Sequence, residues 1–298
     1  MKFKSIASFK GHTGLIQDIA ITPNNRKLAS LSQNKIFVWD LETKQRTLIL
    51  EGHSDTIMSL CISPDGRLIV SGSLDKTTKV WNIETGELIH TLALNRDPIY
   101  SVAFSPDNKL IASGGASKYK CDRGKKTRIY LWNLDGELVD ILSGHELRIN
   151  QLAFNYDGTS IVSASNDGTV KVWNIASGKE FITIAICLLF FAFAPNENSL
   201  VTSGADGLEV WNLDAPGQTV STVHPGKILG HCTISPDGVL AYASRESIQI
   251  YSLPNLELLQ TLECSHPYSI KFSQDGTKLI AGCSGWNCRG FAQVWQVL

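Results

Sequence analysis

Short runs in which apolar and polar residues alternate follow one another along the whole chain. One stretch contains four of them in a row: Leu60–Ser63, Leu68–Ser73, Lys79–Asn82 and Leu88–Ala93. Alternating runs of this length, rich in β-branched residues, are typical of β-strands. Asp-Gly and Pro-Asp pairs stand between the runs, and such pairs favour tight turns. The pattern therefore predicts a unit of four short antiparallel strands and essentially no helix.

The same unit recurs along the chain. A tryptophan ends the third run of each unit at intervals of roughly 40 residues, with one longer interval. These residues are Trp39, Trp81, Trp132, Trp173, Trp211 and Trp295, with Tyr251 in the same place between the last two. A second marker is the turn after the first run, which reads Ser-Pro-Asp-Gly from Ser63 and from Ser235 and has related forms elsewhere. Both markers predict seven repeats in a single domain over residues 1–298, with an insertion in the third repeat at about 117–128.

A single four-stranded sheet cannot bury both of its faces, so we expect the seven sheets to pack face to face in a ring. The last repeat stops after its third strand, Ala292–Leu298. At the other end of the chain, Phe3–Phe9 has the pattern of a fourth strand. We therefore expect the N-terminal segment to complete the last sheet, which closes the ring and removes an exposed edge.

Composition narrows the function classes. Lys plus Arg number 27 against 28 Asp plus Glu, so the net charge of −1 gives no general attraction to nucleic acid or to an anionic membrane. The most apolar run, Ile182–Ala194, is too short to cross a bilayer, and the first residues lack the apolar core of a signal peptide. The seven cysteines lack metal-ligand spacing, which favours reduced thiols in the cytoplasm. Cys283 and Cys288 could pair in an oxidising compartment, although two free thiols are favoured.

With these repeats the chain resembles the WD-repeat family over essentially its whole length. A Gly-His pair, the Ser-Pro-Asp-Gly turn, an acid in the second turn and a final Trp-Asp or Trp-Asn pair recur in fixed phase. The resemblance implies an all-β, seven-bladed β-propeller of four-stranded antiparallel blades. It also implies a buried set of His, Ser, Asp and Trp in a blade, which we call the tetrad, in which the indole N–H donates to the Ser hydroxyl. Two repeats carry it in full: His53, Ser71, Asp75 and Trp81 in the second, and His145, Ser163, Asp167 and Trp173 in the fourth.

Other repeats keep only part of the tetrad. The first has His12, Ser30 and Trp39 but Gln33 and Asn34 in the second turn, and the fifth has Thr202, Asp206 and Trp211 without a histidine. A Ser, a His and an Asp within hydrogen-bond reach also resemble a catalytic triad. Because the set recurs beside a buried tryptophan and offers no oxyanion hole, we interpret it as structural. No phosphate-binding loop or metal-ligand cluster is evident, so we expect no enzyme activity, no cofactor and no metal.

In the family, partner contacts lie three and five residues after the Gly-His histidine and just before the turn acid. Transferred by phase, the predicted contact positions are Leu15, Gln17, Thr56, Met58, Leu74, Pro98, Tyr100, Arg148, Asn150, Asn166, Cys187, Leu189, Ala205, Ile228, Gly230, His266 and Tyr268. Aromatic, Met and aliphatic residues at exposed positions favour a binding surface. The alternative interpretation is that these side chains bury one another at the mouth of the propeller channel.

Two second turns are longer than the rest. The third repeat carries a basic loop with Lys118, Lys120, Arg123, Lys125, Lys126 and Arg128 against one Asp122. The seventh carries an aromatic loop with Trp286, Arg289 and Phe291. Such loops would suit an acidic or phosphorylated peptide, although a solvated charged loop explains the basic residues equally well. An apolar joint at Cys187 is either covered by a partner or is a segment prone to aggregation, and the partner is favoured.

The sequence therefore favours a non-catalytic scaffold that binds a partner protein or peptide on one face of a propeller, without nucleic acid or a membrane. Two alternatives stay open. One is a propeller enzyme with its site at the channel mouth, and the other is a binder of anionic ligands or nucleic acid through the basic loop. The sequence does not identify the partner.

Overall fold

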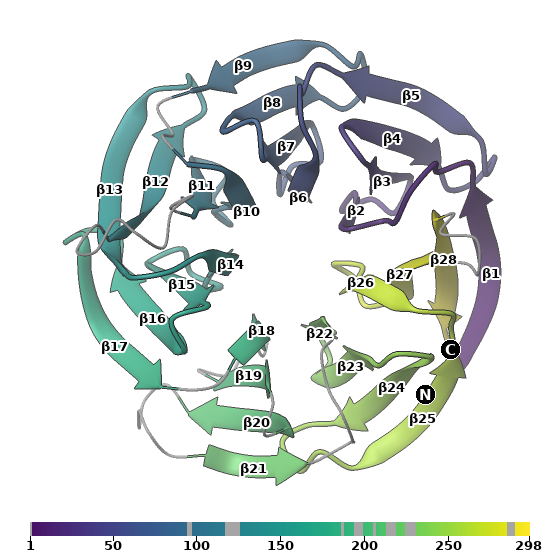
Figure 1. The fold of residues 1–298 in the computed structure, drawn as a ribbon. Helices are drawn as coiled ribbons and strands as arrows, with labels where there is room; N and C mark the ends of the chain where they lie inside the picture. The colour runs from purple at the N-terminus through teal and green to yellow at the C-terminus, as the bar shows by residue number, and fades with distance from the viewer. Residues whose placement is uncertain are drawn as a thin grey trace. The chain divides into compact units, whose positions relative to one another are not determined.

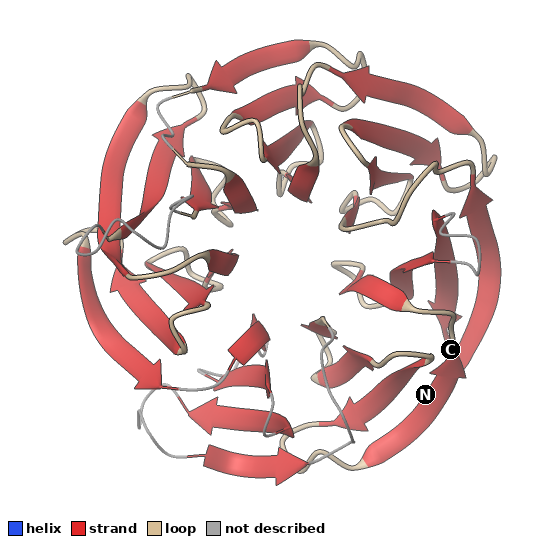
Figure 2. Cartoon of the chain, in the orientation of Figure 1, coloured by secondary structure: helices blue, strands red, loops and turns tan. Residues whose placement is uncertain are grey.

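The computed structural model describes residues 2–93, 97–116, 126–185, 188–193, 199–204, 207–212, 219–223, 231–284 and 290–298. Every regular element among these residues is a β-strand, and no helix capable of crossing a membrane occurs among them (Figure 2). The strands form seven four-stranded sheets, which are the blades of a β-propeller (Figure 1). The fold class predicted from the repeats is thus confirmed.

The first four sheets follow the chain in order. The first contains β2 (Ile19–Ile21), β3 (Lys27–Ser32), β4 (Lys35–Asp40) and β5 (Arg46–Glu51). The second contains β6 (Ile57–Ile62), β7 (Leu68–Ser73), β8 (Thr78–Asn82) and β9 (Leu88–Leu92). The third contains β10 (Ile99–Phe104), β11 (Leu110–Gly115), β12 (Thr127–Asn133) and β13 (Leu138–His145). The fourth contains β14 (Ile149–Phe154), β15 (Ser160–Ser165), β16 (Thr169–Asn174) and β17 (Lys179–Ala185).

The last three sheets include the two ends of the chain. The fifth contains β18 (Leu188–Phe193), β19 (Ser199–Gly204), β20 (Gly207–Asn212) and β21 (Thr219–Val223). The sixth contains β22 (Cys232–Ile234), β23 (Val239–Ala243), β24 (Ser247–Ser252) and β25 (Leu258–Glu263). The seventh contains β26 (Pro267–Phe272), β27 (Lys278–Ser284), β28 (Gly290–Val297) and β1 (Phe3–Lys10). In it β1 pairs antiparallel with β28, so the N-terminal segment completes the last blade as predicted.

The chain divides into two compact units, and each is described by itself. The terminal unit consists of residues 1–32, 39–45 and 187–298, and the middle unit of residues 33–38 and 46–186. That residues 1–298 form one domain therefore stays a prediction. The insertion of the third repeat, apart from its last residues, lies outside the described residues.

The Ser-Pro-Asp-Gly marker is a turn held by its own side chains. The hydroxyl of Ser63 donates to a carboxylate oxygen of Asp65 at 2.5 Å and accepts from the backbone N–H of Leu68 at 2.9 Å. Gly66 adopts a φ of 73°, a left-handed conformation that glycine takes without steric cost. Ser105 and Ser273 make the same hydroxyl-to-carboxylate bond, to Asp107 and Asp275. The same bond therefore holds the first turn of the second, third and seventh repeats.

Neighbouring sheets pack through their apolar faces. In the middle unit Val70 and Val80 of the second sheet pack with Ile99, Val102 and other buried residues of the third sheet. Each fully buried side chain of this size contributes about 1.5–3 kcal/mol. The sheets approach so closely at Gly72 that a Cβ there would meet a methyl group of Ile99 at 2.5 Å. A glycine in β7 is thus required by packing.

Candidate partner-binding surface

The tetrad of the second repeat is a continuous hydrogen-bonded chain. The indole N–H of Trp81 donates to the Oγ of Ser71 at 2.9 Å, and this Oγ lies 2.8 Å from Nε2 of His53. Nδ1 of His53 lies 2.7 Å from a carboxylate oxygen of Asp75. Because a carboxylate only accepts, Nδ1–H donates to it, and in a neutral imidazole Nε2 then accepts from the Ser71 hydroxyl. Every member therefore has its partner inside the blade.

The tetrad of the fourth repeat has the same geometry. Trp173 donates to Ser163 at 2.8 Å, and His145 lies 2.7 Å from Ser163 and 2.8 Å from Asp167. The backbone N–H of Glu146 also donates to Asp167, at 2.9 Å. Each turn acid thus ties the loop before the first strand to the turn after the second strand.

Burial and hydrogen bonding define the protonation states of the tetrad. Burial lowers the pKa of His53 and outweighs the opposing effect of Asp75, so the imidazole is neutral at physiological pH. Burial of Asp75 opposes its ionisation, but hydrogen bonds from Thr77 and His53 outweigh it and hold the pKa of Asp75 below its usual value. Ser71 and Ser163 are both fully buried. Both hydroxyls are therefore shielded from solvent, and their hydrogen-bond partners lie within the blade.

The same backbone hydrogen bond recurs in four repeats and fixes the loop that carries predicted contact positions. Its donor is the N–H three residues after the second-strand position of Ser71, and its acceptor is the carbonyl three residues after the Gly-His position. The four bonds are Leu74 to Thr56 at 2.9 Å, Ala116 to Pro98 at 3.1 Å, Asn166 to Arg148 at 2.8 Å and Ser284 to His266 at 3.2 Å. Loop and second turn are therefore held side by side in each of these repeats.

In the middle unit four of these positions touch one another, and we call them the arginine cluster: Tyr100, Arg148, Asn150 and Asn166. The guanidinium of Arg148 lies over the ring of Tyr100, 4.7 Å from its centroid. Its Nε donates to the side-chain oxygen of Asn150 at 2.8 Å, and the amide of Asn150 donates to Asn166 at 2.6 Å. Within the described ranges, no carboxylate forms an ion pair with Arg148, which is half-buried.

Comparison with family models gives the deciding observation. The model described as "WD domain, G-beta repeat" matches residues 3–40, 44–82, 86–133 and 136–174, which is more than half of the chain. This chain belongs to the WD-repeat family. The matched repeats include both tetrads and the arginine cluster.

Several curated proteins are similar to this WD-repeat chain. The Periodic tryptophan protein 2 homolog of Caenorhabditis elegans is 24% identical over 277 residues, covering 84% of this chain and 30% of the relative. Apoptotic protease-activating factor 1 of Rattus norvegicus is 26% identical over 271 residues, covering 85% of this chain and 20% of the relative. The small ribosomal subunit protein RACK1y of Oryza sativa subsp. japonica is 27% identical over 178 residues, covering 56% and 50%. The chain thus spans half or less of the length of these three relatives.

The remaining WD repeats keep the tryptophan bond more consistently than the histidine. The indole donates to a second-strand hydroxyl at 2.8 Å from Trp39 to Ser30, and at 3.0 Å from Trp132 to Ser113 and from Trp211 to Thr202. In the first repeat His12 also lies 2.7 Å from Ser30. Asp206 of the fifth repeat lies outside the described residues.

The other predicted contact positions are more scattered. Thr56, Met58 and Leu74 in the middle unit are half-buried, as are Leu15 and Gln17 in the terminal unit. His266 and Tyr268 are exposed in the terminal unit, Tyr268 by 46%. Leu189 lies in β18, and its side chain is not described; Trp286, Cys187, Ala205, Ile228 and Gly230 lie outside the described residues. The structure joins none of these into a group comparable to the arginine cluster within the part it describes.

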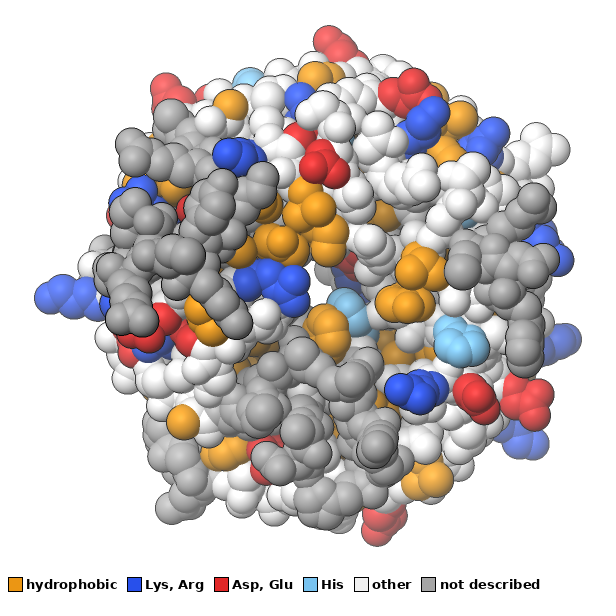
Figure 3. All heavy atoms as spheres, in the orientation of Figure 1, with side chains coloured by type: hydrophobic (Ala, Val, Ile, Leu, Met, Phe, Trp, Pro, Cys, Tyr) orange, Lys and Arg blue, Asp and Glu red, His pale blue; other side chains and the backbone are white. Residues whose placement is uncertain are grey.

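Only the end of the basic loop can be placed. Lys118, Lys120, Arg123 and Lys125 lie outside the described residues. Lys126 forms an ion pair with Glu146 at 2.8 Å, and Arg128 is exposed on β12. Figure 3 shows hydrophobic side chains next to Lys or Arg side chains on the face it presents. Of the two loop cations that the structure describes, Lys126 is therefore already paired with a carboxylate.

Sequence reasoning missed a charged group on the first strands of the terminal unit. Asp18, 7% exposed, accepts from Ser269 at 3.0 Å and pairs with Lys271 at 3.2 Å. The ring of His231 packs against that of Phe190 at a tilt of 30°, with centroids 3.8 Å apart, and burial lowers the pKa of His231 to about 4. Counting back from the first hairpin turn could have identified these two residues. Asp18 and His231 both stand four residues before that turn, where the second and third repeats have Ser59 and Ser101.

Proposed function

We propose that this WD-repeat chain is a non-catalytic scaffold that binds a partner protein or peptide, and that the arginine cluster is part of its binding surface. One observation carries the proposal: a half-buried guanidinium is held in place by Tyr100 and Asn150 yet has no carboxylate partner among the described residues. Burying a cation without a counter-charge is unfavourable, whereas a bidentate carboxylate or phosphate would satisfy it.

The geometry of the cluster supports an acidic or phosphorylated ligand. Stacking on the Tyr100 ring and the Nε bond to Asn150 orient Arg148, so little side-chain entropy is lost when a ligand binds. The Asn150–Asn166 bond extends this rigid group to the turn after β15. Exposed Leu147, next to Arg148, offers an apolar contact beside the charge.

Neither alternative function gains comparable support. The buried Ser71 and Ser163 hydroxyls are spent on the tetrads, which speaks against an enzyme built on them. Lys126 already pairs with Glu146, which weakens the basic loop as a site for nucleic acid. Two relatives, named as a ribosomal subunit protein and a protease-activating factor, are consistent with a role in protein assemblies. We also propose a cytoplasmic location, which fits the free thiols of the described cysteines.

Arrays of short peptides test the ligand chemistry. Glu-rich sequences are printed beside their Gln-rich and phosphoserine counterparts and probed with the full chain. We expect Arg148→Ala to weaken binding to the acidic or phosphorylated members by about tenfold or more. Arg148→Lys keeps the charge but loses the fork geometry, so an intermediate loss is expected. Arg67→Ala removes an exposed arginine outside both the cluster and the basic loop and serves as the matched control.

Two outcomes would contradict the proposal. Equal binding by Arg148→Ala and the unchanged chain would remove the cluster from the binding surface. Equal binding to Glu-rich and Gln-rich peptides would exclude an acidic ligand. Steep salt-dependent binding to RNA or DNA in place of peptide binding would favour the nucleic-acid alternative.

A further inference from the structure

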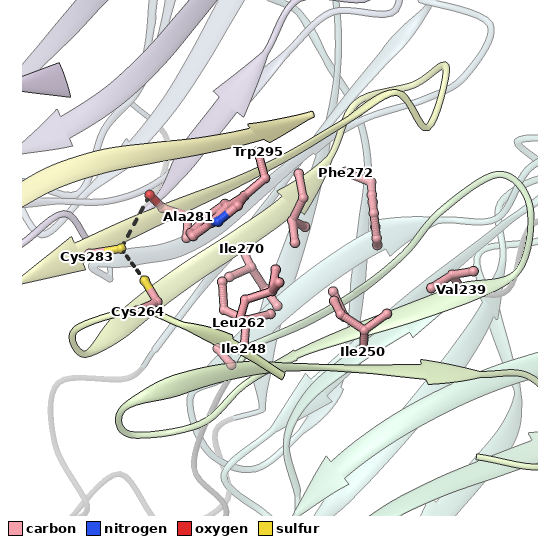
Figure 4. Packing of buried hydrophobic residues seen from close by; sticks show 13 residues of the cluster. Val239, Ile248, Ile250, Leu262, Cys264, Ile270, Phe272, Ala281, Cys283 and Trp295 are labelled. Carbon is pink, nitrogen blue, oxygen red and sulfur yellow. Dashed lines mark hydrogen bonds between the residues drawn. The ribbon is translucent and has the colours of Figure 1, made fainter. Parts of the chain in front are cut away.

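Two buried cysteines of the terminal unit face each other. Cys264 follows β25 on the connection into β26, and Cys283 lies in β27. Their sulfur atoms are 2.7 Å apart, and Figure 4 shows them at the edge of a buried apolar cluster. Apolar side chains in contact usually keep their atoms about 4 Å apart, while a disulfide has a length of about 2.05 Å. The two sulfurs thus lie much nearer to bonding distance than ordinary packing requires.

The surroundings hold the two thiols in this position. Pro267 pairs with Cys283 in the β26–β27 ladder, and the N–H of Ser284 donates to the carbonyl of His266 at 3.2 Å. The N–H of Cys264 donates to the carbonyl of Glu246 at 3.3 Å. Both backbones are therefore anchored on either side of the sulfur contact. Closing a bond requires only a small movement of the side chains.

We propose that Cys264 and Cys283 form a reversible disulfide when the protein meets a peroxide oxidant. The side chain of Cys264 is 8% exposed and that of Cys283 is fully buried, so the oxidant reaches Cys264 first. The Cys264 sulfur displaces water from hydrogen peroxide and becomes a sulfenic acid. The Cys283 sulfur then attacks the Cys264 sulfur, the S–O bond breaks, and a second water leaves with the thiol proton. In total two thiols lose two hydrogens and one peroxide becomes two waters.

The pKa of Cys283 bears on the rate of this reaction. The contact with Cys264, together with burial, raises the pKa of Cys283. A thiol that stays protonated is a weak nucleophile, so the second step is slow compared with that of an activated redox cysteine. We therefore expect the disulfide to form slowly.

The bond would join the β25–β26 connection to β27. The closed loop runs from 264 to 283 and contains Ser265–Tyr268, the segment that carries exposed His266 and Tyr268. Oxidation would therefore hold this segment against β27. If the proposed binding function extends to these two residues, oxidation would stiffen that part of the surface. The disulfide itself does not depend on the binding function.

Direct mapping on the unchanged full chain tests the proposal. The protein is reduced, freed of reductant and incubated with or without hydrogen peroxide, and its free thiols are then alkylated in denaturant. We expect all seven cysteines to be alkylated without peroxide and two fewer to be alkylated after peroxide. Digestion without reduction should release one linked peptide pair joining Cys264 to Cys283, which separates on reduction. Full alkylation after peroxide, or a link from Cys283 to any other cysteine, would overturn the proposal.

Matched variants give a second readout. Cys264→Ala should lose the linked pair, whereas Cys61→Ala, which removes a cysteine of β6 in the middle unit, should keep it. Oxidation should raise the melting temperature of the unchanged chain by roughly 5 °C, because the bond closes a loop of moderate length. An equal rise in Cys264→Ala would contradict the proposed link. If Cys264→Ala fails to fold, the mapping on the unchanged chain still decides.

Discussion

The third and fourth sheets of the middle unit have the same strand order but different internal bonding. The fourth holds a full tetrad, in which His145 bridges Ser163 and Asp167. In the described part of the third, the matching hydroxyl of Ser113 is bonded to Trp132, and no histidine reaches it. Both sheets nevertheless keep four paired strands and share one apolar interface. The two sheets thus share the tryptophan and its hydroxyl partner, and the His–Asp pair is an addition in the fourth.

The second turns of the two sheets show what that addition does. In the fourth sheet Asp167 must meet His145 and the N–H of Glu146, so the turn from Asn166 to Gly168 is short. In the third sheet no carboxylate has to be delivered to a histidine, and the same turn carries the insertion of the basic loop. A repeat without the His–Asp pair can therefore accept extra residues at this turn.

The largest expected effect comes from the shared tryptophans. Trp132→Ala and Trp173→Ala should each lower the free energy of unfolding by about 3–5 kcal/mol, because each leaves a large cavity and an unpaired hydroxyl. Urea titration followed by circular dichroism measures both. Values that differ by more than about 2 kcal/mol would show that the two sheets do not depend on the indole to the same degree.

A smaller loss is expected when the His–Asp pair is broken. His145→Ala should cost about 2–3 kcal/mol, since Asp167 keeps its charge but loses its buried partner. A double-mutant cycle with Asp167→Asn should give a coupling energy of about 1–2 kcal/mol. Asp135→Asn, in an exposed turn of the third sheet, is the control and should change stability by less than about 0.5 kcal/mol. A coupling energy near zero would mean that the pair does not brace the blade.

The smallest effect concerns pH. The pKa of His53 is lowered in the folded protein, so its unfolded form binds a proton first, and stability falls as pH drops below about 6.5. The pKa of Asp75 is also lowered, which adds a second loss as pH falls below about 4. Because the pKa of His231 is also lowered, His53→Gln should shrink the upper step without abolishing it. Stability measured from pH 8 to 3 in both proteins checks this, and an unchanged upper step in the variant would exclude His53 as its source.

The repeat pattern predicted the strands and turns because they depend on short-range chemistry. Ser63 and Asp65 form their turn within five residues, and the indole of Trp81 reaches a hydroxyl on the adjacent strand. Even the pairing of β1 with β28 followed from the strand missing in the last repeat. The turn and the indole bond recur in several repeats, so one copy predicts the others.

Contacts between repeats could not be predicted in the same way. The Arg148–Tyr100 stack joins two sheets, and its existence depends on side-chain conformations that no phase rule specifies. The Cys264–Cys283 contact was not foreseen, because the sequence does not show that the β25–β26 connection lies against β27; Cys288, considered as a possible partner of Cys283, lies outside the described residues. A single sequence places such residues on the right strand but does not show which of them meet.

The pairing of β1 with β28 has a consequence for biosynthesis. Lys10 lies opposite Phe291, so the N-terminal strand leaves the ribosome long before its partner has been made. At about 5–20 residues per second, the delay is on the order of tens of seconds. During that time β1 is an unpaired strand on a growing nascent chain, and the seventh blade cannot be completed.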